Sequence, residues 1–473
     1  MSTFRNNEHT NLGKLIVTPG KEPRYRQIVT ALRQQISSGA LAIGSRLPSS
    51  RALAQDLGVS RATVVTAYDQ LVAEGYAEAR RGAGLFVCDV APIRTPQVPP
   101  TATAPPPPPK PDALLPGAPD PAVFPARSWA RCVSRVARID PHSLSHQEDP
   151  LGDPRLRHEI AAYVGRWRGI TCSGEQVLVT SGAREALELA MDFLVQGEDI
   201  ALEAPGFIPT QRFASARGWP VRWLRAGARG AEVPRQMAKV TLLTPSHQFP
   251  LGGTLPVPQR QAFLQAARER NGWIIEDDFD SEFRYAGLPV PAMAALDGDG
   301  RCIYVGTFSK TFSHALRLGY AILPPALVEP FRALFQHPSA GAAITAQRPL
   351  AEFMASGQYD RHIRRARRLY AERYAAAADA LARWPAALGR FERHNAGMQI
   401  AFHLAAGPAD KDICKTAASE GFALRPLSPH DPERRTNGLL IGFCQGTAED
   451  LPQQIARLQK IIEASGRAEG AIF

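Results

Sequence analysis

The residues with the clearest chemical potential lie in the second half of the chain. Lys310 is followed seven residues later by Arg317, and Asp277 lies about thirty residues upstream within the acidic run 276–280. A lysine amine can form a Schiff base with an aldehyde, and an arginine can bind a phosphate group. A carboxylate such as that of Asp277 can keep a ring nitrogen protonated. Together these residue types indicate a pocket for a phosphorylated aldehyde cofactor.

Strands that alternate with helices must position these residues. Short apolar runs predict the strands, and helical stretches such as 183–195 and 257–269 lie between them. This alternation predicts a mostly parallel α/β sheet that helices cover on both faces. Two later strands, near 398–403 and 439–443, predict a smaller C-terminal subdomain. The predicted strands of the main sheet are 177–180, 240–243, 273–276, 302–306 and 319–323.

The first ninety residues predict three short helices followed by a hairpin. Ser49 or Ser50 can cap the second helix, Gly58 can end it, and Ser60 can cap the third. Residues 76–87 predict a hairpin that turns at its glycines. These elements predict a winged helix-turn-helix over residues 20–90. The inward-facing side chains of its helices should be Ile28, Leu32, Ile36, Leu53, Leu57, Val64, Ala67, Tyr68 and Leu71.

A proline-rich segment separates the two halves. Ten of the 20 residues from Pro92 to Pro111 are proline, and residues 105–109 are all proline. Such a segment cannot form regular backbone hydrogen bonds, so it favours an extended and fairly stiff spacer. We expect residues 91–112 to act as a linker, with a PxxP docking motif as the alternative. Residues 113–473 then form the second domain.

Composition and charge narrow the class of protein. With 473 residues and 44% hydrophobic content, the chain can fold as two or three domains. The net charge of +10 suits a polyanionic partner. The six cysteines are widely spaced, without a CxxC pair or metal-ligand spacing, so we expect free thiols and no metal site. The start of the chain has no apolar signal core and no run of roughly 18 apolar residues occurs, so we expect a cytoplasmic protein.

Two motifs in the N-terminal domain resemble the GntR family of winged-helix repressors. Residues 44–51 have the sequence GSRLPSSR and residues 57–64 the sequence LGVSRATV, with Tyr68 following. In that family the second and third helices form the helix-turn-helix, and the third enters the major groove of double-stranded DNA. The start of the third helix, one residue of the second and the wing are then expected to contact DNA. The residues concerned are Arg51, Ser60, Arg61, Thr63, Arg80 and Arg81.

From about Leu114 onwards, the chain resembles a fold-type I aminotransferase, an enzyme class that binds pyridoxal 5'-phosphate. Residues 306–311 have the sequence GTFSKT, and residues 276–280 the sequence EDDFD. Proteins that join this domain to a GntR head form the MocR/GabR subfamily of transcriptional regulators, so the resemblance covers nearly the whole chain. It implies that Lys310 forms the Schiff base, that Asp277 faces the ring nitrogen and that Arg317 binds the phosphate. The expected fold class is an α+β winged helix-turn-helix joined to a fold-type I α/β domain with a smaller C-terminal α/β subdomain.

The resemblance also assigns other residues of the cofactor pocket. The amides of Ser181, Gly182 and Ala183, where a strand turns into a helix, are expected to bind the phosphate together with Thr307. Phe207 occupies the position of an aromatic residue that stacks on the pyridine ring in the subfamily.

The loop 244–250 should approach the phenolic oxygen of the cofactor. His247 or Gln248 in this loop would either contact that oxygen or stabilise the turn. Phe279 stands where the subfamily usually has a tyrosine whose hydroxyl bonds the same oxygen. Because that donor is missing, the charge state of the internal aldimine at rest is left open.

Two further departures concern the substrate side of the pocket. Residues 147–152 have the sequence QEDPLG, where the expected pattern is Tyr-x-Asp-Pro-x-Gly. The strand near 439–442 carries no arginine where many aminotransferases hold the substrate carboxylate, although Arg425 could substitute from the preceding segment. These departures count against an efficient transaminase and leave Schiff-base chemistry intact.

The helix that contains residues 361–370 is expected to have one buried and one basic side. Ile363, Ala366, Tyr370 and Tyr374 should form the buried stripe. The opposite face would be a solvated surface or a dimer contact, with an auxiliary DNA contact as the alternative. Its four arginines are Arg361, Arg364, Arg365 and Arg368.

The combined motifs predict a pyridoxal-phosphate-dependent transcriptional regulator. A primary-amine effector, such as an amino acid, a sulfonate, a diamine or a cofactor precursor, would displace Lys310 and form an external aldimine. Resemblance implies a head-to-tail homodimer that binds an operator, with residues 113–473 binding the effector and dimerising. The alternative is an active aminotransferase with an autoregulatory DNA-binding head. A third interpretation is a DNA-binding protein whose large domain only dimerises, without a cofactor.

Overall fold

The computed structural model describes residue 17 and residues 22–90, 113–146, 149–287, 290–335, 341–405 and 407–470. The chain divides into two compact units, one ending at Pro107 and the other beginning at Pro108. The expected linker 91–112 lies outside the described residues. In the described ranges, no helix is long and apolar enough to cross a membrane. All six cysteines are free thiols, as expected.

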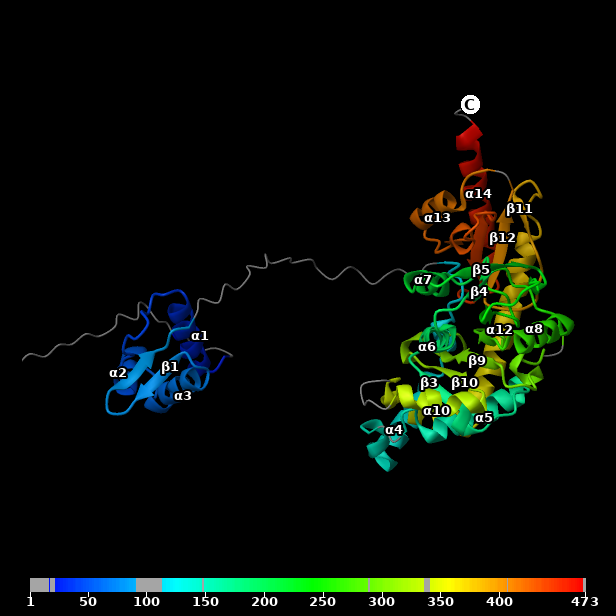
Figure 1. Ribbon diagram of the computed structural model, residues 1–473. Coiled ribbons are helices and arrows are strands. Elements are labelled where there is room, and N and C mark those ends of the chain that lie inside the picture. Colours follow the sequence, from blue (N-terminus) through cyan, green and yellow to red (C-terminus); the bar gives the residue numbers. More distant parts are fainter. Residues whose placement is uncertain are drawn as a thin grey trace, which may run out of the picture. The chain divides into compact units, whose positions relative to one another are not determined.

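The N-terminal unit is a winged helix-turn-helix, as the sequence predicts (Figure 1). The hydroxyl of Ser49, and not that of Ser50, caps the second helix by accepting a hydrogen bond from the Ala52 amide. Gly58 ends that helix in the left-handed region at φ 63°, and Ser60 caps the third helix through the Thr63 amide. The elements are α1 (Arg24–Ser37), α2 (Ser50–Leu57), α3 (Arg61–Ala73), β1 (Ala77–Arg80) and β2 (Gly84–Val87).

One apolar cluster holds these elements together. Of the predicted inward-facing side chains all are buried except Leu57, which is partly buried against the cluster. Tyr68 of α3 also donates a hydrogen bond to the Pro48 carbonyl oxygen at 2.8 Å, which ties α3 to the segment before α2. Burial raises the pKa of the Tyr68 phenol.

The large unit is built on an eight-stranded sheet of order β3-β10-β9-β8-β7-β4-β5-β6. The strands β9, β8, β7, β4 and β5 are parallel, whereas β10 runs antiparallel between β3 and β9. The sheet is therefore mostly parallel, as predicted. Its strands are β3 (Val177–Thr180), β4 (Ile200–Ala204), β5 (Val221–Gly227), β6 (Gly230–Ala231), β7 (Val240–Leu243), β8 (Trp273–Asp278), β9 (Cys302–Thr307) and β10 (Gly319–Ile322).

Helices cover both faces of this sheet. Along β3, Val177 and Val179 pack in one apolar cluster while Leu178 packs in another, because successive side chains of a strand point to opposite faces. The first cluster includes residues of α5 (Pro154–Arg168), α11 (Gln347–Ala355) and α12 (Gln358–Leu381), and the second includes α6 (Ala183–Val195). The other helices around this sheet are α4 (Ala126–Ile139), α7 (Ile208–Ala216), α8 (Val257–Arg270), α9 (Phe308–Thr311) and α10 (Pro325–Leu334).

The predicted smaller subdomain is a separate antiparallel sheet of order β11-β12-β14-β13. The long helix α12 supplies Ala366, Tyr370 and Tyr374 to the apolar cluster beneath this sheet, so α12 contributes to both subdomains. The elements are β11 (Gly389–Phe391), β12 (Gln399–Leu404), α13 (Asp410–Ser419), β13 (Arg425–Pro426), β14 (Gly438–Gly442) and α14 (Asp450–Gly470).

Replacement of Ser49 by alanine should destabilise α2, because the Ala52 amide loses its hydrogen-bond acceptor. The expected cost is about 1 kcal/mol, which is roughly a fivefold change in the opening equilibrium. Hydrogen exchange of peptides from residues 24–87, followed by mass spectrometry, measures it. Ser50→Ala is the matched control, since Ser50 does not cap the helix, and equal acceleration by both changes would contradict the assignment.

Candidate functional site

Lys310 lies directly after the sheet, in the short helix α9 that follows β9. Thr307, the last residue of β9, starts this helix by accepting a hydrogen bond from the Ser309 amide at 3.1 Å. The Lys310 Nζ atom donates to the Gly117 carbonyl oxygen at 2.5 Å. Burial lowers the pKa of Lys310, while the negative charges of Asp280 and Asp277 oppose this shift. A lowered pKa increases the fraction of neutral amine that can act as a nucleophile.

Gly117 is a functional-site residue that the sequence did not reveal. Its φ is +62°, and a side-chain carbon there would lie 3.0 Å from the Lys310 Nζ atom and 3.4 Å from the Gln399 Oε1 atom. The segment before α4 therefore closes over the lysine. A Pro-Gly pair at 116–117 is the only signal in the sequence, and such pairs are common in turns.

Asp277 faces the same pocket from β8, the strand next to β9. The two strands are parallel, with Asp277 in register with Val305. Burial raises the pKa of Asp277 to about 8, and the charges of Asp278, Glu203 and Asp280 add to the shift, against Lys310. Among the described residues, nothing donates a hydrogen bond to its buried Oδ1 atom. A protonated ring nitrogen would satisfy this oxygen and supply a compensating positive charge, so the residues present fit a pyridinium cofactor.

The carboxylate of Asp278, the next residue of β8, is bound by other side chains of the protein. Asp278 forms a buried ion pair with Arg168 at 2.7 Å. It also accepts hydrogen bonds from the Tyr304 hydroxyl at 2.8 Å and the Ser281 hydroxyl at 2.8 Å. These contacts join β8 to α5 and β9, so the Asp278 side chain has a structural role.

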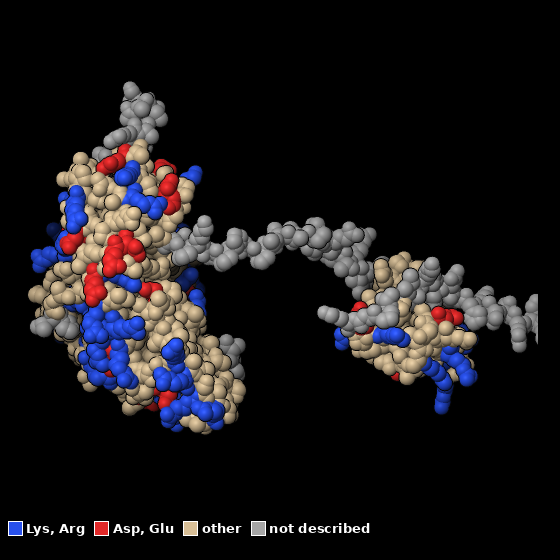
Figure 2. Space-filling model, turned by 180° about the vertical axis from the view of Figure 1, so that it is seen from behind, with Lys and Arg blue, Asp and Glu red and all other residues tan. Residues whose placement is uncertain are grey.

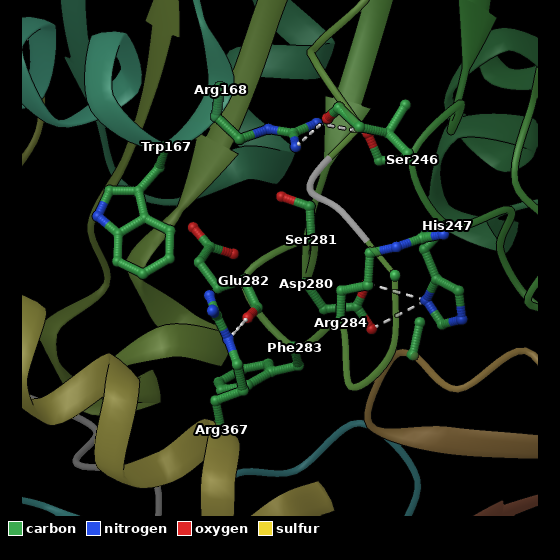
Figure 3. Close-up of a pocket in the computed structure, with 13 residues that line it drawn as sticks. Trp167, Arg168, Ser246, His247, Asp280, Ser281, Glu282, Phe283, Arg284 and Arg367 are labelled. Atoms are coloured by element: carbon green, nitrogen blue, oxygen red, sulfur yellow. Dashed lines mark hydrogen bonds and ion pairs between the residues drawn. The ribbon is translucent and has the colours of Figure 1, made fainter. Parts of the chain in front are cut away.

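His247 and Asp280 line a cavity of about 110 Å³ (Figure 3). The His247 Nδ1 atom lies 2.9 Å from Asp280 Oδ1, and both side chains are buried. Arg168 and Arg367 also line this cavity, and Figure 3 shows them pointing into it from opposite sides. Of the acidic run 276–280, Asp280 is the residue that borders this cavity.

Gln248, the other candidate in this loop, stabilises the turn. Its amide nitrogen donates to the Pro205 carbonyl oxygen at 2.9 Å, and its Oε1 atom accepts from the Leu251 amide at 3.1 Å. Its side chain is fully buried. Of the two candidates, His247 is the one that contacts Asp280 of the acidic run.

The expected phosphate-binding residues converge at one edge of the sheet. Gly319 of β10 is in register with both Thr180 of β3 and Thr307 of β9. A side-chain carbon at Gly319 would lie only 2.5 Å from the Ala183 nitrogen. Arg317, with φ 51°, precedes β10 and is exposed. The strand pairing thus brings the turns at 181–183, at Thr307 and at Arg317 together.

The backbone amides of residues 181–183 differ in whether they already have a hydrogen-bond acceptor. The Ser181 amide already donates to the Glu185 carboxylate at 2.5 Å. The first-turn amides of α6, which begins at Ala183, have no side-chain cap at Gly182. Free amides at the start of a helix favour an anion, so the residues present fit a phosphate group there.

Aromatic rings line the side of the pocket that loop 244–250 forms. The ring of Phe249 lies edge-on to Phe207 and to Phe279, with centroids 5.6 Å apart in both pairs. His247 lies 5.7 Å from Phe279, and His430 lies 5.2 Å from Phe249. Phe207, Phe249 and Phe279 offer no hydroxyl, so this wall supplies apolar contact in place of the tyrosine that the subfamily pattern leads one to expect.

The structure describes some of the residues at which the substrate side of the pocket departs from the aminotransferase pattern. Gln147 and Glu148 lie outside the described residues. Leu440, in the strand that lacks an arginine, is buried in β14. Arg425 pairs with Leu440 in the sheet register but is exposed, and its charge acts on Cys414 of α13. No described contact joins Arg425 to Lys310 or to Asp277.

Basic side chains gather in patches on the face of the large unit shown in Figure 2. The predicted stripe of α12 is buried at Ile363, Ala366, Tyr370 and Tyr374. The arginines on its opposite side, at 361, 364, 365 and 368, are all exposed. Arg367 differs from them: it donates to the Glu282 carbonyl oxygen at 2.6 Å.

In the N-terminal unit, the expected DNA-binding residues lie at the start of α2, the start of α3 and the hairpin. Arg61 donates to the Ser50 hydroxyl at 3.3 Å, which brings the two helix starts together. The Ser60 and Thr63 hydroxyls lie 2.8 Å apart. In the hairpin, Arg80 pairs with Glu78 and lies over the Phe86 ring at 4.5 Å. All six expected residues are exposed except Thr63, which is half-buried.

Comparisons with known proteins agree with both units. Residues 24–87 match the gntR family of bacterial regulatory proteins, and residues 136–458 match the aminotransferase class I and II family. The chain is 35% identical over 471 residues to a probable rhizopine catabolism regulatory protein, MocR, of Rhizobium meliloti, covering 94% of this chain and 95% of that protein. It is 35% identical over 444 residues to the HTH-type pyridoxine biosynthesis transcriptional regulator PdxR of Corynebacterium glutamicum, covering 92% and 95%.

Solved structures show the same fold for the large unit. The α-aminoadipate aminotransferase LysN of Thermus thermophilus, complexed with N-(5'-phosphopyridoxyl)-L-leucine, matches with a TM-score of 0.68 at 25% identity, over 74% of this chain and 92% of that chain. Kynurenine aminotransferase of Pyrococcus horikoshii matches with a TM-score of 0.69 at 23% identity, over 74% and 90%.

The two units together define a helix-turn-helix regulator with an aminotransferase fold as its second domain. Within that class, the chain belongs to the MocR/GabR subfamily of GntR-type transcriptional regulators.

Replacement of Asp277 by asparagine should stabilise the cofactor-free protein at alkaline pH. The carboxyl group has a pKa of 3.8 when unperturbed and about 8 in the folded chain. The folded state therefore keeps a proton that the unfolded state releases, so stability falls as the pH rises from about 4 to about 8. Asparagine removes this loss, and the free energy of unfolding at pH 8 should rise by more than about 1 kcal/mol in urea denaturation.

Asp278→Asn is the matched control and should act in the opposite direction. It leaves Arg168 buried without its partner, which should lower the free energy of unfolding by about 3–5 kcal/mol. Equal effects of the two replacements would contradict the assignment of Asp277 as the unpaired carboxyl group.

Proposed function

We propose that the chain is a pyridoxal-phosphate-dependent transcriptional regulator that responds to a primary amine. The observation that carries the proposal is the pairing of a buried lysine amine, Lys310, with the unsatisfied carboxylate oxygen of Asp277 in one pocket. A domain with only a structural role would not need a buried lysine beside an unsatisfied carboxylate. Through the winged helix-turn-helix of the same chain, ligand binding in the pocket would change the affinity for DNA.

The bound cofactor would supply an aldehyde and an electron-withdrawing ring. Lys310 would hold the aldehyde carbon, and Asp277 would keep the ring nitrogen protonated. The amides of Gly182 and Ala183, with Thr307 and Arg317, would hold the phosphate, whereas the Ser181 amide would first have to leave Glu185. Phe207 would stack on the ring, while His247 and Phe279 would line its phenolic side.

The effector would be a compound with a primary amine that exchanges with Lys310. Amino acids, sulfonates, diamines and cofactor precursors all satisfy this requirement. This exchange would free the Lys310 amine, and the contacts of the new ligand would bias the large and small sheets toward closure. The two states must bind DNA with different affinity for this to regulate transcription.

The expected domain limits belong to this proposal. Residues 20–90 would bind the operator, residues 91–112 would link the domains, and residues 113–473 would bind the effector and form a head-to-tail homodimer. The second candidate function is an active aminotransferase with an autoregulatory head. The intact pair of Lys310 and Asp277 favours it, and accumulation of the pyridoxamine form with release of a keto acid would establish it.

Lys310→Ala should abolish the response of DNA binding to amines, because no amine remains to be displaced. Fluorescence anisotropy with a duplex selected from a random-sequence pool measures affinity, with and without a panel of primary amines. Cofactor-loaded wild-type protein should change its affinity by roughly fivefold or more with one of them. Lys415→Ala, on the exposed side of α13, should behave as wild type. An amine response that survives in Lys310→Ala would refute the proposal.

Arg61→Ala should weaken DNA binding and reduce the dependence on salt. Removing one phosphate or base contact typically costs about 1–3 kcal/mol, and a lost phosphate contact lowers the slope of log K against log salt by about one. Arg33→Ala is the control in the same unit, because Arg33 pairs with Glu74 at the far end of α3. Loss of affinity in the control but not in Arg61→Ala would place the DNA elsewhere.

A further inference from the structure

A second cavity lies in the large unit, between the eight-stranded sheet and the four-stranded sheet. Its volume is about 300 Å³. Its walls come from the end of β4, the β5–β6 turn, the strands β11 and β12, and the loop 431–436. Lys310 and Asp277 are not part of its lining, so it is distinct from the pocket proposed for the cofactor. Its basic lining residues are Arg225, Arg390, Arg435, His394 and His403.

Two acidic residues line this cavity, Glu392 and Asp431, and the Glu392 carboxylate lies 3.9 Å from the His394 Nε2 atom. Asp431 is buried and accepts hydrogen bonds from the amides of Glu433 at 3.1 Å and Arg435 at 2.9 Å, so its charge stabilises its own loop. Arg435 pairs with Glu433. Within the described ranges, no ion pair involves Arg225 or Arg390. The lining thus holds three arginines and two histidines against the two carboxylates of Glu392 and Asp431, and its positive charge is in excess.

We propose that this cavity binds a small anion that carries carboxylate or phosphate groups. Arginine binds such groups through paired, charge-assisted hydrogen bonds. Burial lowers the pKa of both His394 and His403, so near neutral pH their rings offer neutral N–H donors, and a bound anion would favour their protonation. The chemistry of the lining therefore selects anions over cations.

This site is connected to the Lys310 pocket through two histidines. At Gly252, a side-chain carbon would lie 2.6 Å from the His394 ring and 3.3 Å from the His247 ring, so both rings close on the same glycine. His247 in turn binds Asp280, whose charge acts on Lys310. An anion beside His394 is therefore coupled electrostatically to the lysine. Because its ligands come from both sheets, it would also hold the two sheets together.

Calorimetric titration of the full chain, saturated with pyridoxal phosphate, tests the site. The titrants are inorganic phosphate in one arm and malonate in the other, which separates a phosphate ligand from a carboxylate ligand. One saturable site per chain is expected with at least one of them. The Arg225→Gln/Arg390→Gln double variant should raise the Kd by at least about tenfold. Arg383→Gln, exposed beyond the end of α12, is the matched control and should leave the Kd unchanged.

A repeat in the Arg317→Gln background separates this cavity from the expected phosphate site of the cofactor. Binding that disappears in Arg317→Gln but persists in the double variant would overturn the proposal, as would the absence of binding for both anions. If the wild type fails to take up the cofactor, the function proposed above falls. Anion binding that still depends on Arg225 and Arg390 would then stand by itself.

Discussion

The burial of an acidic run at the end of β8 is the constraint on which the large unit depends. Residues 276, 277, 278 and 280 carry carboxylates that are nearly inaccessible to solvent, and such groups are costly to bury unless each finds a donor or a cation. Backbone amides donate hydrogen bonds to Glu276, and Arg168 forms an ion pair with Asp278. The His247 ring contacts Asp280. Asp277 is left with an unsatisfied oxygen. Among the described residues, Asp277 is therefore the carboxyl group of this run that keeps a buried oxygen without a hydrogen-bond donor, and its charge acts on Lys310.

The sheet topology explains why the remaining parts of the pocket meet there. In parallel strands the carboxyl ends lie at one edge, so β8 and β9 place Asp277 and Lys310 together. The antiparallel strand β10, inserted between β3 and β9, brings Arg317 to the same edge beside the start of α6. A domain with a purely structural role would have no need of an arginine, a lysine and a free helix start at this position. This convergence is the physical reason for assigning the edge to a phosphorylated cofactor.

Local patterns allowed much of the fold to be predicted from the sequence. The strands 177–180 and 240–243 and the helix 183–195 have the predicted bounds, because their apolar spacing is a strong signal. The strands β4 and β5 were not predicted: β4 contains the buried Glu203, and β5 alternates with exposed polar residues at the edge. Glu203 is tolerated in β4 because Thr244 donates hydrogen bonds to it, and burial raises its pKa to about 7.

Contacts between distant residues could not be predicted in this way. The approach of Gly117 to Lys310 spans 193 positions, and neither residue carries a local signal of the other. The pairing of His394 with His247 across Gly252 likewise depends on how the small sheet meets the large one. The roles of the motif residues came from the resemblance to a family, whereas the second cavity became visible only in the folded structure.

Borohydride reduction of the full chain incubated with pyridoxal phosphate, followed by peptide mass mapping, is the most direct test of the central claim. Reduction converts a Schiff base into a stable amine that marks the lysine involved. A single modified peptide that contains Lys310 is expected, and Lys310→Ala should lose this modification because the amine that forms the Schiff base is gone. Modification spread over exposed lysines such as Lys411 and Lys415, at the same level in both proteins, would contradict the central claim.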